Sequence, residues 1–108
     1  MHAHRIEFRT TDADVIAIRR SGAPRARKQS AEHLALGLTV RGLRGQQGLS
    51  QEELGHRADL HRNYVGAIER GEINPTFRVL LKLERGLDVP LVEMMELHDR
   101  IRARRGER

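Results

Sequence analysis

The sequence predicts an all-α protein in which one compact domain of five helices follows a short N-terminal extension. A chain of 108 residues has room for one hydrophobic core. Only three of its residues are aromatic, and an aliphatic core suits short packed helices better than a β-sandwich. From residue 30 onward, apolar residues recur at helical spacing between residues that commonly begin and end helices. We expect the extension over residues 1–29, the domain over residues 30–99 and a basic tail over residues 100–108.

The N-terminal extension is the part of the chain with the fewest structural patterns. Residues 4–9 alternate polar and apolar side chains, which favours a strand. Residues 11–21 begin with acidic residues and end with two arginines, which favours a helix, although the apolar run inside them also fits a second strand. Residues 22–29 form a basic linker, either a solvated tail or an arm that follows phosphates.

The first helix of the domain is expected to begin after Ser30, an N-cap residue. Leu36, Val40 and Leu43 recur at helical spacing and should face the core. Three glycines interrupt this stretch, and each weakens a helix by about 1 kcal/mol relative to alanine. Tertiary packing must therefore stabilise this helix.

Residues 49–71 predict two short helices joined by a tight turn. Ser50 and Glu53 have the spacing of a capping box, which begins the first of the two. Asp59 can adopt the left-handed conformation that ends a helix. His61 or Arg62 should begin the second helix, with later apolar residues facing inward and a glycine at its end. Two helices of this length and connection match a helix-turn-helix.

Two more helices are expected after the loop that ends at Pro75. Thr76 should cap the fourth helix, which Gly86 should end. Its buried residues should be Phe77, Leu80, Leu81 and Leu83. Pro90 fits the first turn of the fifth helix. A 3-4-3 spacing there predicts the seam of a helix pair, and hence a dimer interface, at Leu91, Met94, His98 and Ile101.

The composition is that of a basic protein rich in arginine. The net charge is +5 and the sequence pI about 10.9, and guanidinium groups suit phosphates and base edges. There is no cysteine, and the six histidines form no closed set of metal ligands. No nucleophile–base pair stands out either. We therefore expect no cofactor, no metal and no enzyme, and, since no apolar run could span a membrane, a cytoplasmic location at the nucleoid.

Several motifs together resemble the helix-turn-helix family of the lambdoid phage repressors and Cro (the XRE type). They are Leu43-Arg44, GLSQEEL at residues 48–54, Tyr64-Val65, IERG at residues 68–71 and NPT at residues 74–76. The resemblance extends over roughly residues 36–97. Gly55 and Asp59 depart from it, where the family usually has alanine and glycine. It implies a bacterial or phage regulator of transcription that binds double-stranded DNA, as a homodimeric repressor or autoregulator on a palindromic operator.

The expected DNA-contacting residues follow from where a recognition helix meets the major groove. Its first turn and outward face contact bases, here His61, Arg62, Asn63, Gly66 and Ala67. Arg62 can donate two hydrogen bonds to a guanine, or can instead bind a phosphate.

Other residues are expected to contact the DNA backbone or to support the site. The resemblance implies that Gln51 holds a phosphate together with the amides of its helix N-terminus. It also implies backbone contacts at Asn74, Thr76 and Arg78. Tyr64 can either donate its hydroxyl to a phosphate or pack on the domain surface, and Arg41 is a further candidate for a phosphate contact. The resemblance also implies a buried ion pair between Arg44 and Glu69, which would set the angle of the recognition helix.

A second hypothesis gives the extension the main role. An antitoxin or other interaction protein of the same fold would use residues 1–29 to bind a second protein. A controller of restriction–modification genes would be a variant of the first hypothesis.

Overall fold

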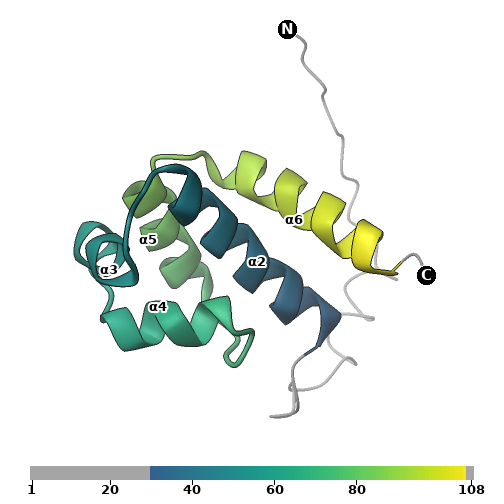
Figure 1. The fold of residues 1–108 in the computed structure, drawn as a ribbon, viewed down its shortest axis with the longest axis horizontal. Helices are drawn as coiled ribbons and strands as arrows, with labels where there is room; N and C mark the ends of the chain where they lie inside the picture. The colour runs from purple at the N-terminus through teal and green to yellow at the C-terminus, as the bar shows by residue number, and fades with distance from the viewer. Residues whose placement is uncertain (1–29, 107–108) are drawn as a thin grey trace, which may run out of the picture.

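The computed structural model describes residues 30–106. These residues form five helices and no strand, which confirms the predicted all-α fold (Figure 1). The helices are α2 (Ala31–Gln46), α3 (Gln51–Ala58), α4 (Arg62–Glu69), α5 (Phe77–Leu87) and α6 (Leu91–Gly106). The strand expected over residues 4–9, the helix over residues 11–21 and the linker over residues 22–29 lie outside the described residues.

The helices begin where the capping residues predict. The hydroxyl groups of Ser30, Ser50 and Thr76 each accept a hydrogen bond from a backbone N–H in the first turn of α2, α3 and α5. The capping box of α3 is complete, because the Glu53 carboxylate also accepts from the Ser50 backbone N–H at 2.8 Å. Local sequence therefore fixes where each of these three helices begins.

Aspartates in the left-handed conformation end two of the helices. Asp59 follows α3 with a φ of 58°, as predicted, and Asp88 follows α5 with a φ of 56°. The prediction that Gly86 ends α5 is wrong, because the helix continues through Leu87. Gly86 is instead a packing residue: a Cβ there would lie 2.7 Å from the Cβ of Ala58, so its absence lets α5 approach α3 closely.

The core of the described domain is aliphatic, as the composition predicts. Its fully buried large residues are Val40, Leu54, Val65, Ile68, Leu83, Leu87 and Met94. Phe77 and Leu81, which were expected to be buried, are 66% and 37% exposed. They lie one turn apart on the outer side of α5, whereas Leu83 and Leu87, also one turn apart, face inward.

The last helix is longer than expected and is held against the first. The tail predicted from residue 100 is helical through Gly106. Arg102 forms an ion pair with Glu32 of α2 at 3.2 Å, and the His98 ring lies 3.2 Å from the Glu32 carbonyl oxygen. Figure 1 shows α6 running alongside α2 over most of its length. These contacts order a segment whose composition alone suggests fraying.

The apolar stripe of α6 packs within the monomer. Met94 is fully buried, and Leu91 and Ile101 are half-buried. Of the predicted dimer-interface residues Leu91, Met94, His98 and Ile101, only Met94 is fully enclosed, where a second copy cannot reach it; the other three are half-buried and keep part of their surface exposed. The 3-4-3 spacing identified a real seam, but the facing helix is α2 of the same chain.

An ion pair and a close backbone approach fix α4 against α2. The Arg44 guanidinium donates to both carboxylate oxygens of Glu69, at 2.6 and 2.9 Å, and a third N–H donates to the Leu49 carbonyl at 2.8 Å. The side chains of Arg44 and Glu69 are only 17% and 4% exposed. The hydrogen bonds to Glu69 raise the pKa of Arg44 above its ordinary value, so the guanidinium stays charged. One buried interaction thus joins α2, the loop after it and α4.

Gly37→Ala tests the close approach of α2 to α4. A Cβ at Gly37 would overlap the backbone carbonyls of Ile68 and Glu69, which cannot rotate away. We expect the free energy of unfolding in urea to fall by about 2 kcal/mol or more. Gly42→Ala, on the same helix, is the matched control. A Cβ at Gly42 would meet nothing within 4 Å, so this change should raise the free energy of unfolding by up to about 1 kcal/mol. Similar effects of the two changes would contradict the packing described.

Glu69→Ala tests the ion pair. It leaves the mostly buried Arg44 guanidinium without its acceptor, and should lower the free energy of unfolding by about 3–5 kcal/mol. The control is Glu72→Ala, which removes the exposed Arg70–Glu72 pair and should leave the urea midpoint nearly unchanged. If Glu69→Ala unfolds at the same midpoint as the wild type, the pair does not hold α4.

Candidate nucleic-acid interface

The helix-turn-helix consists of α3, the turn at residues 59–61 and α4. One face of α4 is locked into the domain, since Val65 and Ile68 are fully buried. The start of α4 is open: His61, Arg62 and Asn63 are all exposed. In Figure 1, α4 lies at the lower left, below the other described helices. The result is a short helix held firmly on one side, with polar residues free at its N-terminal end.

His61 begins α4 through its side chain. Its ring nitrogen Nδ1 accepts a hydrogen bond from the Asn63 backbone N–H at 3.0 Å, so His61 is the N-cap and Arg62 the first helical residue. This settles which of the two residues opens the helix. The same hydrogen bond holds the His61 imidazole at the N-terminal end of α4, where the base contacts are predicted.

Arg62 is exposed and lightly restrained. Its guanidinium lies 3.5 Å from a carboxylate oxygen of Glu52 on α3, and the two side chains are 61% and 73% exposed. An exposed pair of this kind contributes little to stability and exchanges readily with other partners. Glu52 therefore keeps Arg62 near the surface without covering it.

Gly66, one of the predicted base contacts, is covered in this structure. The residue is buried, because the Gln51 and Arg70 side chains lie across it. Ala67 is half-buried. Helical spacing predicted Gly66 on the outward face of α4. Spacing alone could not show that the long side chains of Gln51 and Arg70 lie over this glycine. The exposed candidates for base contact are the first three residues from His61 to Asn63.

The predicted phosphate-contacting residues differ in how free they are. Arg41, Asn74 and Arg78 are exposed. The Thr76 hydroxyl is used as the N-cap of α5, and Tyr64 is half-buried against the core. Gln51 is half-buried and donates from Nε2 to Glu69 at 3.0 Å. Arg41, Asn74 and Arg78 can therefore reach a ligand most directly.

Arg70 was not among the predicted contacts but belongs to this surface. Its guanidinium donates to both oxygens of Glu72, at 2.8 and 3.1 Å, and its side chain is 59% exposed. The hydrogen bonds with Glu72 raise the pKa of Arg70 and lower that of Glu72. The spacing from Gly66 to Arg70, one helical turn, was the available sequence signal.

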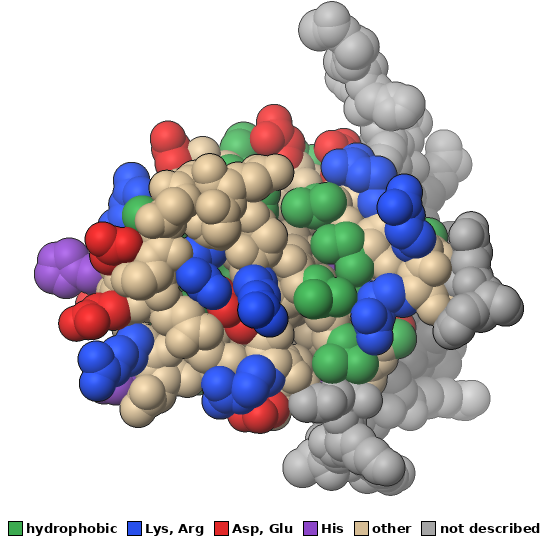
Figure 2. Space-filling model, viewed as in Figure 1, with side chains coloured by type: hydrophobic (Ala, Val, Ile, Leu, Met, Phe, Trp, Pro, Cys, Tyr) green, Lys and Arg blue, Asp and Glu red, His purple; other side chains and the backbone are tan. Residues whose placement is uncertain are grey.

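The surface around α4 mixes both signs of charge. Figure 2 shows Lys and Arg side chains along the edge where Figure 1 places α4, with Asp and Glu side chains beside them. This surface is therefore not uniformly basic: Arg62 and Arg70 each lie beside an acidic partner, Glu52 and Glu72.

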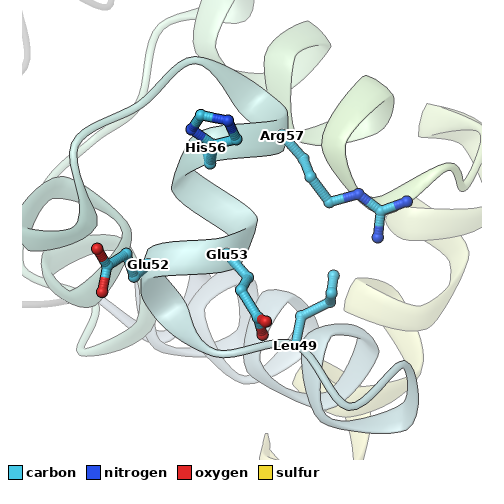
Figure 3. Close-up of a pocket in the computed structure, with 5 residues that line it drawn as sticks. All are labelled: Leu49, Glu52, Glu53, His56 and Arg57. Carbon is cyan, nitrogen blue, oxygen red and sulfur yellow. The ribbon is translucent and has the colours of Figure 1, made fainter.

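A shallow, open hollow lies against α3. Leu49, Glu52, Glu53, His56 and Arg57 line it. Figure 3 shows Glu52 and Arg57 pointing to opposite sides, with the end of Glu53 beside Leu49. Within residues 30–106, no group of three His, Asp or Glu side chains could hold a metal ion. The described helices include none that is long and apolar enough to cross a membrane.

The chain matches known proteins over this same region. Residues 40–94 match the model of the helix-turn-helix family. Control protein C.SmaI of Serratia marcescens is 38% identical over 56 residues, which cover 52% of this chain and 67% of that protein. Control protein C.BamHI of Bacillus amyloliquefaciens is 34% identical over 64 residues, covering 58% of this chain and 79% of that protein.

Solved structures agree with the sequence relatives. The restriction-modification controller protein C.AhdI from Aeromonas hydrophila superposes with a TM-score of 0.59 at 40% identity, covering 60% of this chain and 98% of that chain. The matched residues contain the Arg44–Glu69 pair and both helices of the motif. The chain therefore belongs to the helix-turn-helix family, in the XRE type of the lambdoid phage repressors and Cro.

Proposed function

We propose that this protein is a sequence-specific DNA-binding regulator of transcription that acts as a homodimer on a palindromic operator. The observation that carries the proposal is the exposed start of α4, with Arg62 and Asn63 on a helix whose other face is locked by the core. A helix presented in this way fits the major groove of duplex DNA. Such a regulator acts on the chromosome in the cytoplasm, and its mechanism requires no catalytic step.

The mechanism separates affinity from sequence choice. Arg41, Asn74 and Arg78 contact phosphates, together with Gln51 at the N-terminus of α3, and set the position of the domain on the duplex. Arg62 and Asn63 then face base edges, where an arginine pairs with guanine and an asparagine with adenine. Because Arg62 is held only by an exposed carboxylate, it can exchange Glu52 for a base without a large cost.

A homodimer supplies the contacts that one small domain lacks. Two copies on a two-fold axis place two recognition helices one helical turn apart on the DNA. Much of the apolar stripe of α6 packs inside the monomer, which leaves less of it for a second copy. Phe77 on α5 and Val92 on α6 are the most exposed large hydrophobic side chains of the described domain, at 66% and 65%. We propose that the second copy covers these two residues.

The relatives suggest which genes are regulated. Two are named control proteins, and the solved structure is of a restriction-modification controller. We propose the same role here, in which the protein binds upstream of restriction–modification genes and of its own gene. The alternative role in binding a second protein depends on residues 1–29, outside the described residues. Deleting them should leave operator binding intact.

Selection of bound sequences from a random DNA pool tests the DNA-binding proposal. The wild type should select a two-fold symmetric site. Arg62→Ala should relax the preference at one position in each half-site, with a loss of about 1–3 kcal/mol of discrimination there. Arg57→Ala, an exposed arginine on α3 that no proposed contact uses, should leave the selected site unchanged. A wild type that selects no sequence would refute the proposal.

Sedimentation equilibrium tests the dimer surface. Val92→Asp and Phe77→Asp should each shift the dimer toward monomer, because a charge would be placed in a dry contact. Both positions are largely exposed in the monomer, so the folded domain should keep its helical circular dichroism. Leu38→Asp, on α2, should not change the measured mass. Unchanged association of both variants would place the interface elsewhere.

A further inference from the structure

The Gln51 side chain bridges the two helices of the motif. It starts from the first residue of α3 and reaches α4, where its Nε2 lies 3.0 Å from a carboxylate oxygen of Glu69. On the way it crosses Gly66: a Cβ at that position would lie 3.3 Å from Gln51 Oε1 and 3.6 Å from Nε2. The amide therefore occupies space into which the side chain of any larger residue at position 66 would project.

Glu69 determines which way the Gln51 amide faces. A carboxylate only accepts hydrogen bonds, so the nitrogen of the amide must face Glu69. Glu69 is itself immobile, since Arg44 holds both of its oxygens and its side chain is 4% exposed. Hydrogen bonds thus run without a break from Arg44 on α2, through Glu69 on α4, to Gln51 on α3.

We propose that Glu69 is a positioning residue for DNA binding: it orients the Gln51 amide for its phosphate, and Gly66 keeps clear the space in which that amide lies. The proposal rests on the proposed function and adds to it a second role for the buried ion pair. One N–H of the amide is used by Glu69, and the other is left for a phosphate oxygen. Arg44 neutralises Glu69, so the carboxylate behind the amide does not repel that phosphate.

The test is a double-mutant cycle between Gly66→Ala and Gln51→Ala, with the change in Kd for the selected operator, taken per subunit of the dimer, as the readout. Gln51→Ala should raise the Kd about tenfold, the effect of losing one hydrogen bond to a charged group. Gly66→Ala should raise it about threefold to tenfold, because the methyl group displaces the amide. In the Gln51→Ala background, Gly66→Ala should change the Kd by less than about twofold.

The cycle separates an effect of Gly66→Ala through Gln51 from other ways in which this substitution could change the Kd. The new methyl group would also press on the Arg70 guanidinium, 3.0 Å away, and could meet the DNA directly. Either effect would persist without Gln51. A Gly66→Ala effect that is undiminished in the Gln51→Ala background, or absent from the wild type, would overturn the proposal.

Stability distinguishes positioning from a general loss of structure. Gly66→Ala adds a better helix former and meets only the ends of flexible side chains, so its melting temperature should equal or exceed that of the wild type. Gly42→Ala is the control: it should raise the melting temperature with no change in Kd. Lower melting for Gly66→Ala would show that the affinity loss comes from the fold and would overturn the inference.

Glu69→Gln tests the positioning residue itself. It keeps the size of the side chain but removes one of the acceptors that Arg44 and Gln51 share, so it should raise the Kd by about the same factor as Gln51→Ala, and the two changes should not add. If this variant is unfolded by circular dichroism, the Gly66 cycle alone decides. A wild type that binds no DNA would instead refute the proposed function, which distinguishes that failure from a failure of this inference.

Discussion

The buried ion pair between Arg44 and Glu69 is the interaction on which the arrangement of this domain depends. It joins α2 to α4 and, through the Leu49 carbonyl, to the loop that leads into α3. A buried pair is costly to form and still more costly to break, because the remaining charge has no partner. Its geometry therefore holds α4 at one tilt, and this tilt sets the direction in which the exposed residues at the start of α4 face.

Most of the fold could be predicted because its boundaries are set by local interactions. The Ser50–Glu53 capping box and the left-handed Asp59 involve residues within a few positions of one another, and both are as predicted. The all-aliphatic core followed from composition for a similar reason, since few aromatic residues are available to fill it. Where the physical cause is short-range, the sequence is sufficient.

Apart from the ends of α5 and α6, the failures concern which surface faces which. The seam on α6 was recognised, but α2 of the same chain packs against it where a second copy was expected, and Phe77 faces solvent where burial was expected. The glycines of α2 carried equal predicted costs, yet only Gly37 lies where a side chain would overlap α4. Periodicity shows that a stripe of residues shares a face, and it carries no information about the partner of that face.

The site shows the same division. The exposure of Arg62 and Asn63 follows from their place at the start of a helix, whereas the cover that Gln51 and Arg70 provide over Gly66 depends on side-chain paths that span two helices. The restraint on Arg62 by Glu52 likewise comes from a neighbouring helix.

The most direct test of the account is methylation protection on the selected operator. Dimethyl sulfate modifies guanine N7 in the major groove and adenine N3 in the minor groove. If α4 enters the major groove with Arg62 at a base edge, guanine N7 should be protected in both half-sites, and Arg62→Ala should remove that protection. Protection of adenine N3 alone, with guanine N7 fully reactive, would contradict the account.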